Sequence, residues 1–302
     1  MRPLATSPNG GRSSPQRDSY MASASRNEAS ERLIPHIHHN RYNRIGFFSR
    51  SLRRCGGHPL ARAMSQRFFV EQFIQGDRAW LEDAEAHHLL HVMRGQVGDR
   101  IVLFDGSGNE FVGRVEQCQR SRVEVAILSH EQVDRELPFP LVLGVALPKG
   151  DRQRWLVEKC VELGVTRLVP LVTQRSIAQP KSSQRLGRTV IEAAKQCGRN
   201  VLMQIDEPAE LPGFLEAGAQ EDLRVVCHPG GVPLASCLPA SGVAGGVCAA
   251  IGPEGGFQDE EIDAATRLRW QIVTLGKRTL RTETAALALA ARTVSFLALH
   301  KT

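Results

Sequence analysis

The sequence predicts an α/β protein in which a small β-barrel precedes a larger parallel-sheet domain, and three observations support this prediction. Short apolar runs separated by Gly/Asp turns fill residues 67–137, which is typical of a small barrel. From residue 138 onward apolar strand patterns alternate with helical patterns, which indicates a parallel sheet. Residues 1–63 show no sustained periodicity. We therefore expect an extension over 1–63, a barrel over 64–137 and a sheet domain over 138–302.

The extension carries the positive charge of the chain. It contains 11 Arg, no Lys and 3 acidic residues, a net charge of +8, whereas the other 239 residues carry 27 basic and 29 acidic side chains, a net charge of −2. Its richness in Ser, Arg, Asn and Gly predicts disorder. It can be a targeting segment, a true basic arm, or a mis-assigned start upstream of Met64. His36, His38 and His39 have no partners at ligand spacing, so we interpret them as solvated and expect no metal site.

Composition limits the cellular context of the 302-residue chain. No apolar run approaches the length of a membrane span, so no membrane partner is expected. The seven Cys are odd in number and form no Cys-x-x-Cys pair, which favours a reducing, cytoplasmic compartment over a disulfide framework or zinc site. Because the body of the chain is slightly acidic, a nucleic-acid role must depend on local basic patches.

In the barrel region four strands and one helix are expected. Helical spacing of Leu89, Leu90 and Met93 predicts a helix near residues 86–93. The expected strands lie at residues 67–70, 101–104, 111–115 and 123–128. The region also holds cationic side chains that either contact nucleic acid or are ordinary solvated Arg: Arg67, Arg94, Arg114, Arg120 and Arg122.

Beyond a Pro-containing linker at 136–140, five strands alternate with helices. Asp151 can cap a helix over 152–163 that Gly164 ends, and further helices are expected at 189–197 and 283–299. The expected strands lie at residues 141–147, 167–172, 223–227, 247–251 and 272–275.

Two loops at strand-to-helix junctions in this domain contain the strongest functional signal. The first is Ile251-Gly-Pro-Glu-Gly-Gly-Phe257 and the second is Leu275-Gly-Lys-Arg-Thr-Leu-Arg-Thr-Glu-Thr-Ala285. Gly and Pro allow sharp turns and close approach of backbone to a ligand, and loops at the ends of neighbouring parallel strands form a crevice. Neither loop matches a phosphate-binding or dinucleotide fingerprint. The alternative is a tight connection followed by a surface ion pair, with Thr282 as a helix cap.

Several ordered motifs then match a known family from about residue 67 to the C-terminus. They are Leu89-Leu-His-Val-Met-Arg94, Leu103-Phe-Asp-Gly106, Leu147-Pro-Lys-Gly150, Glu162-Leu-Gly-Val165, Glu192-Ala-Ala-Lys-Gln-Cys-Gly-Arg-Asn200 and the two loops above. On these residues the chain resembles the ribosomal RNA small subunit methyltransferase E family, in the SPOUT class of trefoil-knotted methyltransferases. Lys195 departs from the acidic residue expected before Gln196, and we expect this position to be exposed.

The resemblance implies a SPOUT-type knotted parallel-sheet domain preceded by a PUA-like, RNA-binding barrel, working as a homodimer. It also implies S-adenosylmethionine as cofactor, held by backbone groups and apolar side chains of loops that the knot brings together. The implied cofactor-binding residues are Cys227, His228, Ile251, Gly252, Pro253, Gly255, Leu275, Gly276, Leu280 and Thr282.

The implied reaction is methylation of N3 of a uridine in 16S rRNA, within an assembled or late-assembling small ribosomal subunit. Because neutral uridine carries a proton on N3, the site needs cationic groups and a proton acceptor. We cast Arg199 and Arg281 as orienting and charge-stabilising groups, and Glu283 as a candidate base or cofactor anchor. For RNA contact we expect Arg67, Arg94 and Lys149.

Two alternative functions remain open. One is a related methyltransferase acting on another RNA, such as tRNA, or on a ribose hydroxyl. The other is a non-catalytic RNA-binding ribosome assembly factor, which the intact motifs at 252–256 and 280–283 disfavour.

Overall fold

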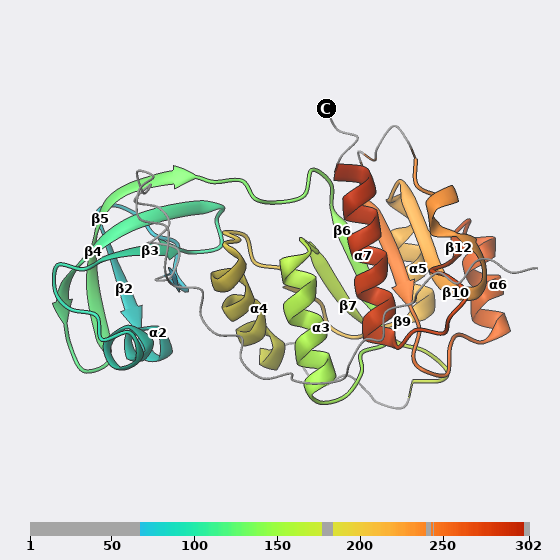
Figure 1. Ribbon diagram of the computed structural model, residues 1–302, viewed down its shortest axis with the longest axis horizontal. Helices are drawn as coiled ribbons and strands as arrows, with labels where there is room; N and C mark the ends of the chain where they lie inside the picture. Colours follow the sequence, from blue (N-terminus) through green and yellow to red (C-terminus); the bar gives the residue numbers. More distant parts are fainter. Residues whose placement is uncertain (1–66, 177–183, 240–242, 244, 299–302) are drawn as a thin grey trace, which may run out of the picture. The chain divides into compact units, whose positions relative to one another are not determined.

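A computed structural model describes residues 67–176, 184–239, 243 and 245–298 (Figure 1). The predicted extension over 1–63, with His36, His38 and His39, lies outside these residues. Within the described ranges no helix is long and apolar enough to cross a membrane. The same ranges hold no group of three or more His, Cys, Asp or Glu side chains that could bind a metal ion.

The N-terminal β-domain is a five-stranded sheet in the order β1-β3-β4-β5-β2. Its strands are β1 (Arg67–Phe69), β2 (Arg78–Glu82), β3 (Arg100–Phe104), β4 (Asn109–Cys118) and β5 (Arg122–Gln132). β1 pairs with β3 in parallel and every other pair is antiparallel. The four expected strands are confirmed. The sequence analysis missed β2, because only Ala79 and Leu81 of its five residues point inward.

The expected helix of this domain is confirmed in two parts, α2 (Asp83–His87) and the π-helical turn η1 (His88–Val92). Leu89 is fully buried in the core of the β-domain. The chain leaves the turn at Arg94, which has a φ of 56°. Non-glycine residues rarely adopt this left-handed conformation, and those that do are enriched at functional sites.

The C-terminal domain contains a parallel sheet in the order β12-β10-β11-β6-β7-β8, with β9 paired to β7. Its strands are β6 (Leu141–Val145), β7 (Arg167–Val172), β8 (Gln204–Ile205), β9 (Ala209–Glu210), β10 (Leu223–Pro233), β11 (Val247–Ile251) and β12 (Gln271–Thr274). All five expected strands are confirmed. β10 runs past its expected end at 227, with an irregularity between Cys227 and Val232.

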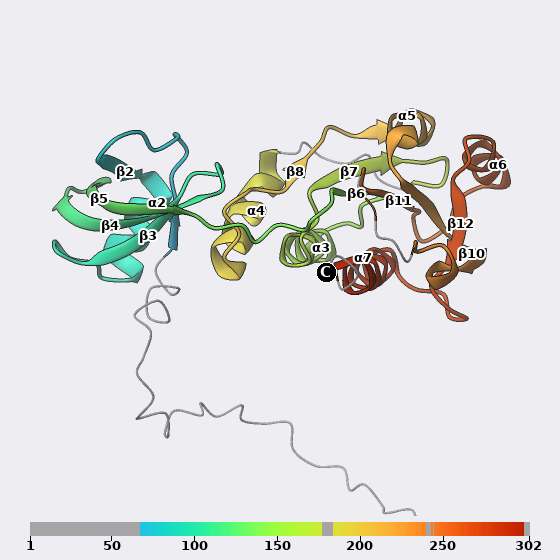
Figure 2. The ribbon, with the colours of Figure 1, turned by 90° about the horizontal axis from the view of Figure 1, so that it is seen from above.

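Helices cover both faces of this sheet. They are α3 (Asp151–Glu162), α4 (Gln184–Cys197), α5 (Leu211–Ala217), α6 (Asp259–Arg267) and α7 (Thr282–Ala298), with short turns η2 (Gly218–Gln220) and η3 (Leu234–Ser236). α3 and α7 lie on one face and α5 and α6 on the other (Figure 2). Each face has its own apolar core, since α3, α4 and α7 share one buried cluster while α5 and α6 share another.

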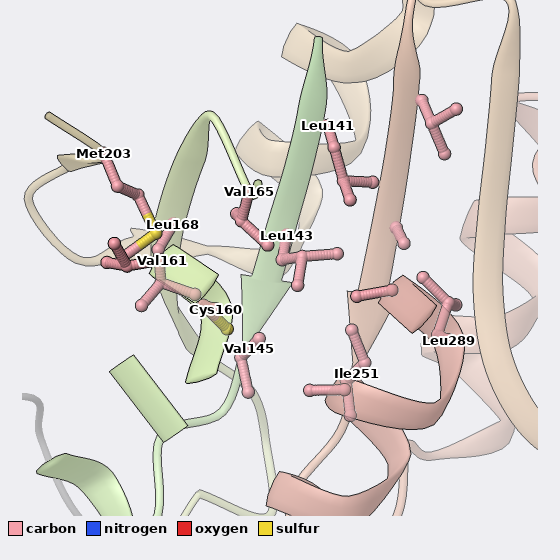
Figure 3. Packing of buried hydrophobic residues seen from close by; sticks show 14 of the residues in the cluster. Leu141, Leu143, Val145, Cys160, Val161, Val165, Leu168, Met203, Ile251 and Leu289 are labelled. Atoms are coloured by element: carbon pink, nitrogen blue, oxygen red, sulfur yellow. The ribbon is translucent and has the colours of Figure 1, made fainter. Parts of the chain in front are cut away.

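Strand residues divide between these cores by simple alternation. Leu141, Leu143 and Val145 of β6 point toward the α3 and α7 side, whereas Val142 belongs to the opposite cluster. The same alternation puts Ile251 of β11 beside Leu289 of α7 (Figure 3). Because strands buried on both faces lack polar alternation, their short continuous apolar runs were readable in the sequence. The packing fixes the carboxyl ends of β10, β11 and β12 at one edge of the sheet.

Candidate active site

The irregular segment of β10 that begins at Cys227 and the loops that follow β11 and β12 line a cavity of about 370 Å³. Parallel strands place such loops at their carboxyl ends, where ligands bind in open α/β sheets. Every residue expected to bind the cofactor lines this cavity: Cys227, His228, Ile251, Gly252, Pro253, Gly255, Leu275, Gly276, Leu280 and Thr282. The structure therefore brings together three segments that are far apart in the sequence.

The loop after β11 is shaped by close packing around Phe257. A Cβ atom on Gly252 would lie 3.1 Å from the Phe257 ring, so a residue with a side chain at this position would force the ring to shift. Phe257 is buried, and Gln258 then caps α6 through a capping box with Glu261. The cavity wall between Ile251 and Phe257 is consequently made largely of backbone.

The loop after β12 is tied to the first loop and to α7. Gly276 has a φ of 136°, which strains any residue with a side chain. Arg292 of α7 donates a hydrogen bond to the Leu275 carbonyl at 3.0 Å. The Thr282 hydroxyl, a helix cap in the alternative interpretation of this loop, donates to the Gly252 carbonyl at 3.1 Å. Thr282 thus joins both cavity loops at the N-terminus of α7.

The sequence analysis missed Arg175, which also lines the cavity. Its Nη1 donates to the carbonyls of Gly255 at 2.8 Å and Phe257 at 3.4 Å, so it holds the first loop from outside. A signal was present, because Arg175 follows the carboxyl end of β7 on the same edge of the sheet.

The cavity has no activated thiol. Burial raises the pKa of the Cys227 thiol to about 12, so the sulfur remains protonated at neutral pH and contributes an apolar wall. The His228 ring is held by its own loop, since Nδ1 accepts a hydrogen bond from the Gly230 amide at 3.2 Å. Both side chains therefore shape the wall of the cavity.

Beside the cavity, Glu283 forms an incomplete cluster with Arg152 and Glu254. Glu283 is 6% exposed, and its Oε2 has no hydrogen-bond partner among the residues that the structure describes. Arg152 Nη1 lies 3.7 Å from that oxygen and donates to Glu254 Oε1 at 3.1 Å. Arg281 is exposed at the start of α7. Neither Arg281 nor Glu283 lines the cavity itself, although Leu280 and Thr282 do.

Comparison with known proteins identifies the family. The chain matches the RNA methyltransferase domain model over residues 135–294 and the RNA methyltransferase PUA domain model over residues 81–128. A Synechocystis protein named ribosomal RNA small subunit methyltransferase E is 34% identical over 229 residues, which cover 74% of this chain and 75% of that protein. The chain belongs to this family. The Bacillus subtilis member is 29% identical over 238 residues, covering 74% of this chain and 93% of its own length.

Solved structures of similar proteins contain the cofactor. The ribosomal RNA small subunit methyltransferase E of Neisseria gonorrhoeae, bound to S-adenosyl methionine, is 31% identical with a TM-score of 0.70, and the match covers 76% of this chain and 97% of that chain. A Legionella pneumophila methyltransferase in complex with the same cofactor has the same identity and TM-score and is covered to 96%. The predicted fold class, a mixed α/β protein with a parallel sheet and a PUA domain, is thus confirmed.

The structure places Arg199, for which a catalytic role is predicted, in a buried hydrogen-bond network. This side chain is 4% exposed and does not line the cavity. Its Nε donates to Glu136 at 3.0 Å and its Nη2 donates to the other Glu136 oxygen. Nη1 donates to the carbonyls of Val161 and Val165, both at 3.0 Å. Because carboxylate and carbonyl partners occupy this guanidinium, Arg199 holds the linker and the end of α3 together.

Arg67, for which RNA contact is predicted, is also buried and paired. Arg67 is 6% exposed. Its Nη1 forms an ion pair with Glu110, and its Nη2 donates a hydrogen bond to Asn200 Oδ1 at 2.6 Å. Removal from water lowers the pKa of Arg67, as expected for a desolvated cation. A guanidinium enclosed in this way is not available to a phosphate. Arg94 and Lys149 are exposed and stay predicted RNA contacts.

The expectation that position 195 is exposed was wrong. Lys195 is 8% exposed, and its Nζ lies 2.8 Å from Glu85 and 3.2 Å from Glu192. The two carboxylates compensate the buried positive charge of Lys195, which explains how the side chain can be removed from water.

Proposed function

We propose that this protein transfers a methyl group from S-adenosylmethionine to N3 of a uridine in small-subunit (16S) rRNA. The observation that carries the proposal is the cavity, which gathers every residue expected to hold the cofactor. Relatives of 31% identity are solved with that cofactor bound. The proposal extends to a homodimer with a trefoil knot, acting in the cytoplasm on an assembled or late-assembling small subunit.

The residues of the cavity fit the cofactor. Ile251, Leu275 and Leu280 offer apolar surface for a flat adenine, and the close-packed Gly252 leaves backbone groups accessible for its hydrogen bonds. S-adenosylmethionine is a sulfonium compound without a phosphate group, so it needs no phosphate-binding loop. The sequence contains no such loop. When bound, the cofactor supplies an electrophilic methyl group whose bond to sulfur breaks with the electron pair remaining on sulfur.

The chain's own contribution is proton transfer and charge stabilisation at the uridine. N3 must lose its proton as the new N–C bond forms, and Glu283 Oε2 is a buried acceptor with no donor among the described residues. Arg281, exposed at the start of the same helix, can approach the O2 or O4 atom on which negative charge develops. We therefore assign Glu283 as base and Arg281 as charge-stabilising group.

RNA contact is assigned to exposed cations outside this cluster. Arg94 leaves the π-helical turn of the β-domain, which matches the PUA domain model, and Lys149 precedes α3. Phosphate contacts of this kind position an RNA, whereas an extruded base carries the specificity.

The decisive experiment is nucleoside mass spectrometry of small-subunit rRNA from a strain lacking the gene. We expect 3-methyluridine to be lost, to return with the wild-type gene, and to stay absent with R281A. Loss of a methylated nucleoside from tRNA, or of a ribose methyl group, would instead assign another substrate. Unchanged nucleosides together with no S-adenosylmethionine binding by calorimetry would indicate a non-catalytic assembly factor.

A further inference from the structure

We propose that Arg152 is a specificity-determining residue that reads the uracil ring together with Glu283. The pair would bind the imide edge of uracil, where the N3–H donor adjoins a carbonyl acceptor. This inference rests on the proposed function, since it concerns the same reaction. It adds a residue that neither the motifs nor the cavity lining indicates, because Arg152 lies outside the cavity.

The first observation is the unused acceptor of Glu283. A side chain that is 7% exposed has lost most of its contact with water, and Oε2 has no hydrogen bond within the described part of the chain. A buried carboxylate oxygen without a donor is unfavourable, and native structures satisfy most such atoms. The exceptions require a reason, and a ligand that donates a hydrogen bond is one.

The second observation is the position of the neighbouring cation. Arg152 Nη1 lies 3.7 Å from Glu283 Oε2, beyond the roughly 2.7–3.2 Å of a hydrogen bond. The guanidinium instead donates to Glu254, a half-exposed residue of the first cavity loop, at 3.1 Å. With five N–H donors on a planar fork, Arg152 has further donors to offer. An acceptor and a cationic donor thus lie side by side without bonding to each other.

That arrangement is complementary to uracil. The N3–H of the base can donate to Glu283 Oε2 while the adjacent carbonyl oxygen accepts from the Arg152 guanidinium, in two parallel hydrogen bonds. Cytosine presents a bare acceptor at N3 and would have no proton to give the carboxylate at that atom. The same two groups would therefore select uracil and orient N3.

Helix placement favours charge at this point. Arg152 lies in the first turn of α3 and Glu283 in the first turn of α7, so the N-termini of two helices of 12 and 17 residues lie beside each other. Helix N-termini stabilise negative charge. As N3 releases its proton to Glu283 Oε2, the charge that develops on the uracil carbonyl faces Arg152 and these two termini.

The test uses the full-length protein and small ribosomal subunits from a strain lacking the gene. Four variants separate the roles. R152M removes the donor, R152K restores a cation, E254Q removes the negative charge of the other partner of Arg152, and R154M removes a neighbouring exposed cation of α3 as a matched control. The measurements are kcat, KM for subunits, the dissociation constant for S-adenosylmethionine by calorimetry, and thermal unfolding.

For R152M we expect kcat to fall by about 10²- to 10³-fold, the effect of removing one preorganised donor, with KM and cofactor affinity within about threefold of wild type. The kcat of R152K should be at least about tenfold higher than that of R152M, and R154M should keep wild-type kcat. The fold loss in E254Q should be at least about tenfold smaller than in R152M, because Arg152 stays next to Glu283.

Three results would overturn the proposal. R152M within about threefold of wild-type kcat would remove Arg152 from the reaction. Equal losses in R152M and E254Q would show that Arg152 acts only by holding the cavity loop. A large drop in cofactor affinity in R152M would show the same. If the wild-type protein forms no 3-methyluridine in these subunits, the proposed function itself fails, a result distinct from the other three.

Discussion

Two arginine–glutamate pairs of this protein, Arg199–Glu136 and Arg152–Glu283, each contain one buried side chain but differ in how completely they are hydrogen-bonded. Arg199 meets Glu136 through two nitrogens and meets two backbone carbonyls through the third. Arg152 and Glu283 lie 3.7 Å apart, and Glu283 Oε2 has no donor among the described residues. The first pair is complete within the chain, whereas the second leaves a donor and an acceptor for something else.

The difference separates a structural role from a functional one. A buried ion pair is tolerated when every lone pair and proton is used, and breaking it leaves an uncompensated charge. A buried group that the fold leaves unsatisfied lowers stability and persists where chemistry needs it. We therefore expect changes at the first pair to affect folding and changes at the second to affect turnover.

The largest effect is expected for E283Q. Removal of the carboxylate charge takes away the proton acceptor while keeping the shape, so kcat should fall by about 10³-fold or more. Single-turnover methylation of small ribosomal subunits measures this change. The thermal unfolding midpoint should stay the same or rise, because a neutral amide is easier to bury than a carboxylate whose Oε2 receives no hydrogen bond from the described residues. Near-normal turnover, or a collapse of the fold, would place Glu283 with the structural pair.

The opposite outcome is expected for R199M. Loss of the guanidinium leaves Glu136 and two carbonyls without their donor, so the free energy of unfolding should fall by about 3–5 kcal/mol. Urea denaturation measures the loss, and R188M on the exposed side of α4 should change it by less than about 0.5 kcal/mol. Turnover per folded molecule should remain close to wild type. A stable R199M protein without activity would restore the catalytic role that the sequence predicts for Arg199.

Local features of the fold and of the cavity could be predicted from the sequence. The five expected strands of the parallel sheet were recoverable, because runs such as Val247–Ile251 are buried on both faces and need no knowledge of their neighbours. The two cavity loops were recoverable because glycine-rich turns at strand ends are local features, whereas Cys227 and His228 followed only from the family resemblance. Gly252 and Gly276 could be identified on these grounds alone.

Side-chain partners were not recoverable by the same route. Arg199 follows an apparently exposed helix end, and nothing local indicates that Glu136 and the end of α3 enclose it. Arg152 was overlooked because its significance comes from Glu283, 131 positions later in the chain, through a single 3.7 Å approach. Burial and pairing are tertiary properties, so residue type and spacing left them open.

A smaller effect is expected for T282V, which leaves both pairs in place but cuts the tie between the cavity loops. The buried Thr282 hydroxyl donates to the Gly252 carbonyl, and a hydrogen bond of this kind contributes about 1 kcal/mol. The dissociation constant for S-adenosylmethionine should therefore rise roughly fivefold in calorimetry. T266V is the matched control, because the Thr266 hydroxyl donates to the Ile262 carbonyl on an exposed helix face remote from the cavity. An unchanged constant in T282V would mean that the loops keep their positions without this bond.

The smallest effect is expected for R94E, because Arg94 is an exposed cation outside both pairs. If it contacts a phosphate, the loss of this exposed ion pair should weaken binding of small-subunit rRNA by roughly threefold. The slope of log affinity against log salt should also become shallower by about 0.7–0.9 when one phosphate is no longer neutralised. R114E provides the comparison, since Glu116 already neutralises Arg114 at 2.9 Å on the half-exposed surface of β4. Equal decreases in affinity and in salt slope in the two variants would show that rRNA responds to the net charge of the β-domain. A decrease confined to R94E, with kcat at saturating rRNA unchanged, would assign Arg94 to docking and leave recognition of the base to Arg152 and Glu283.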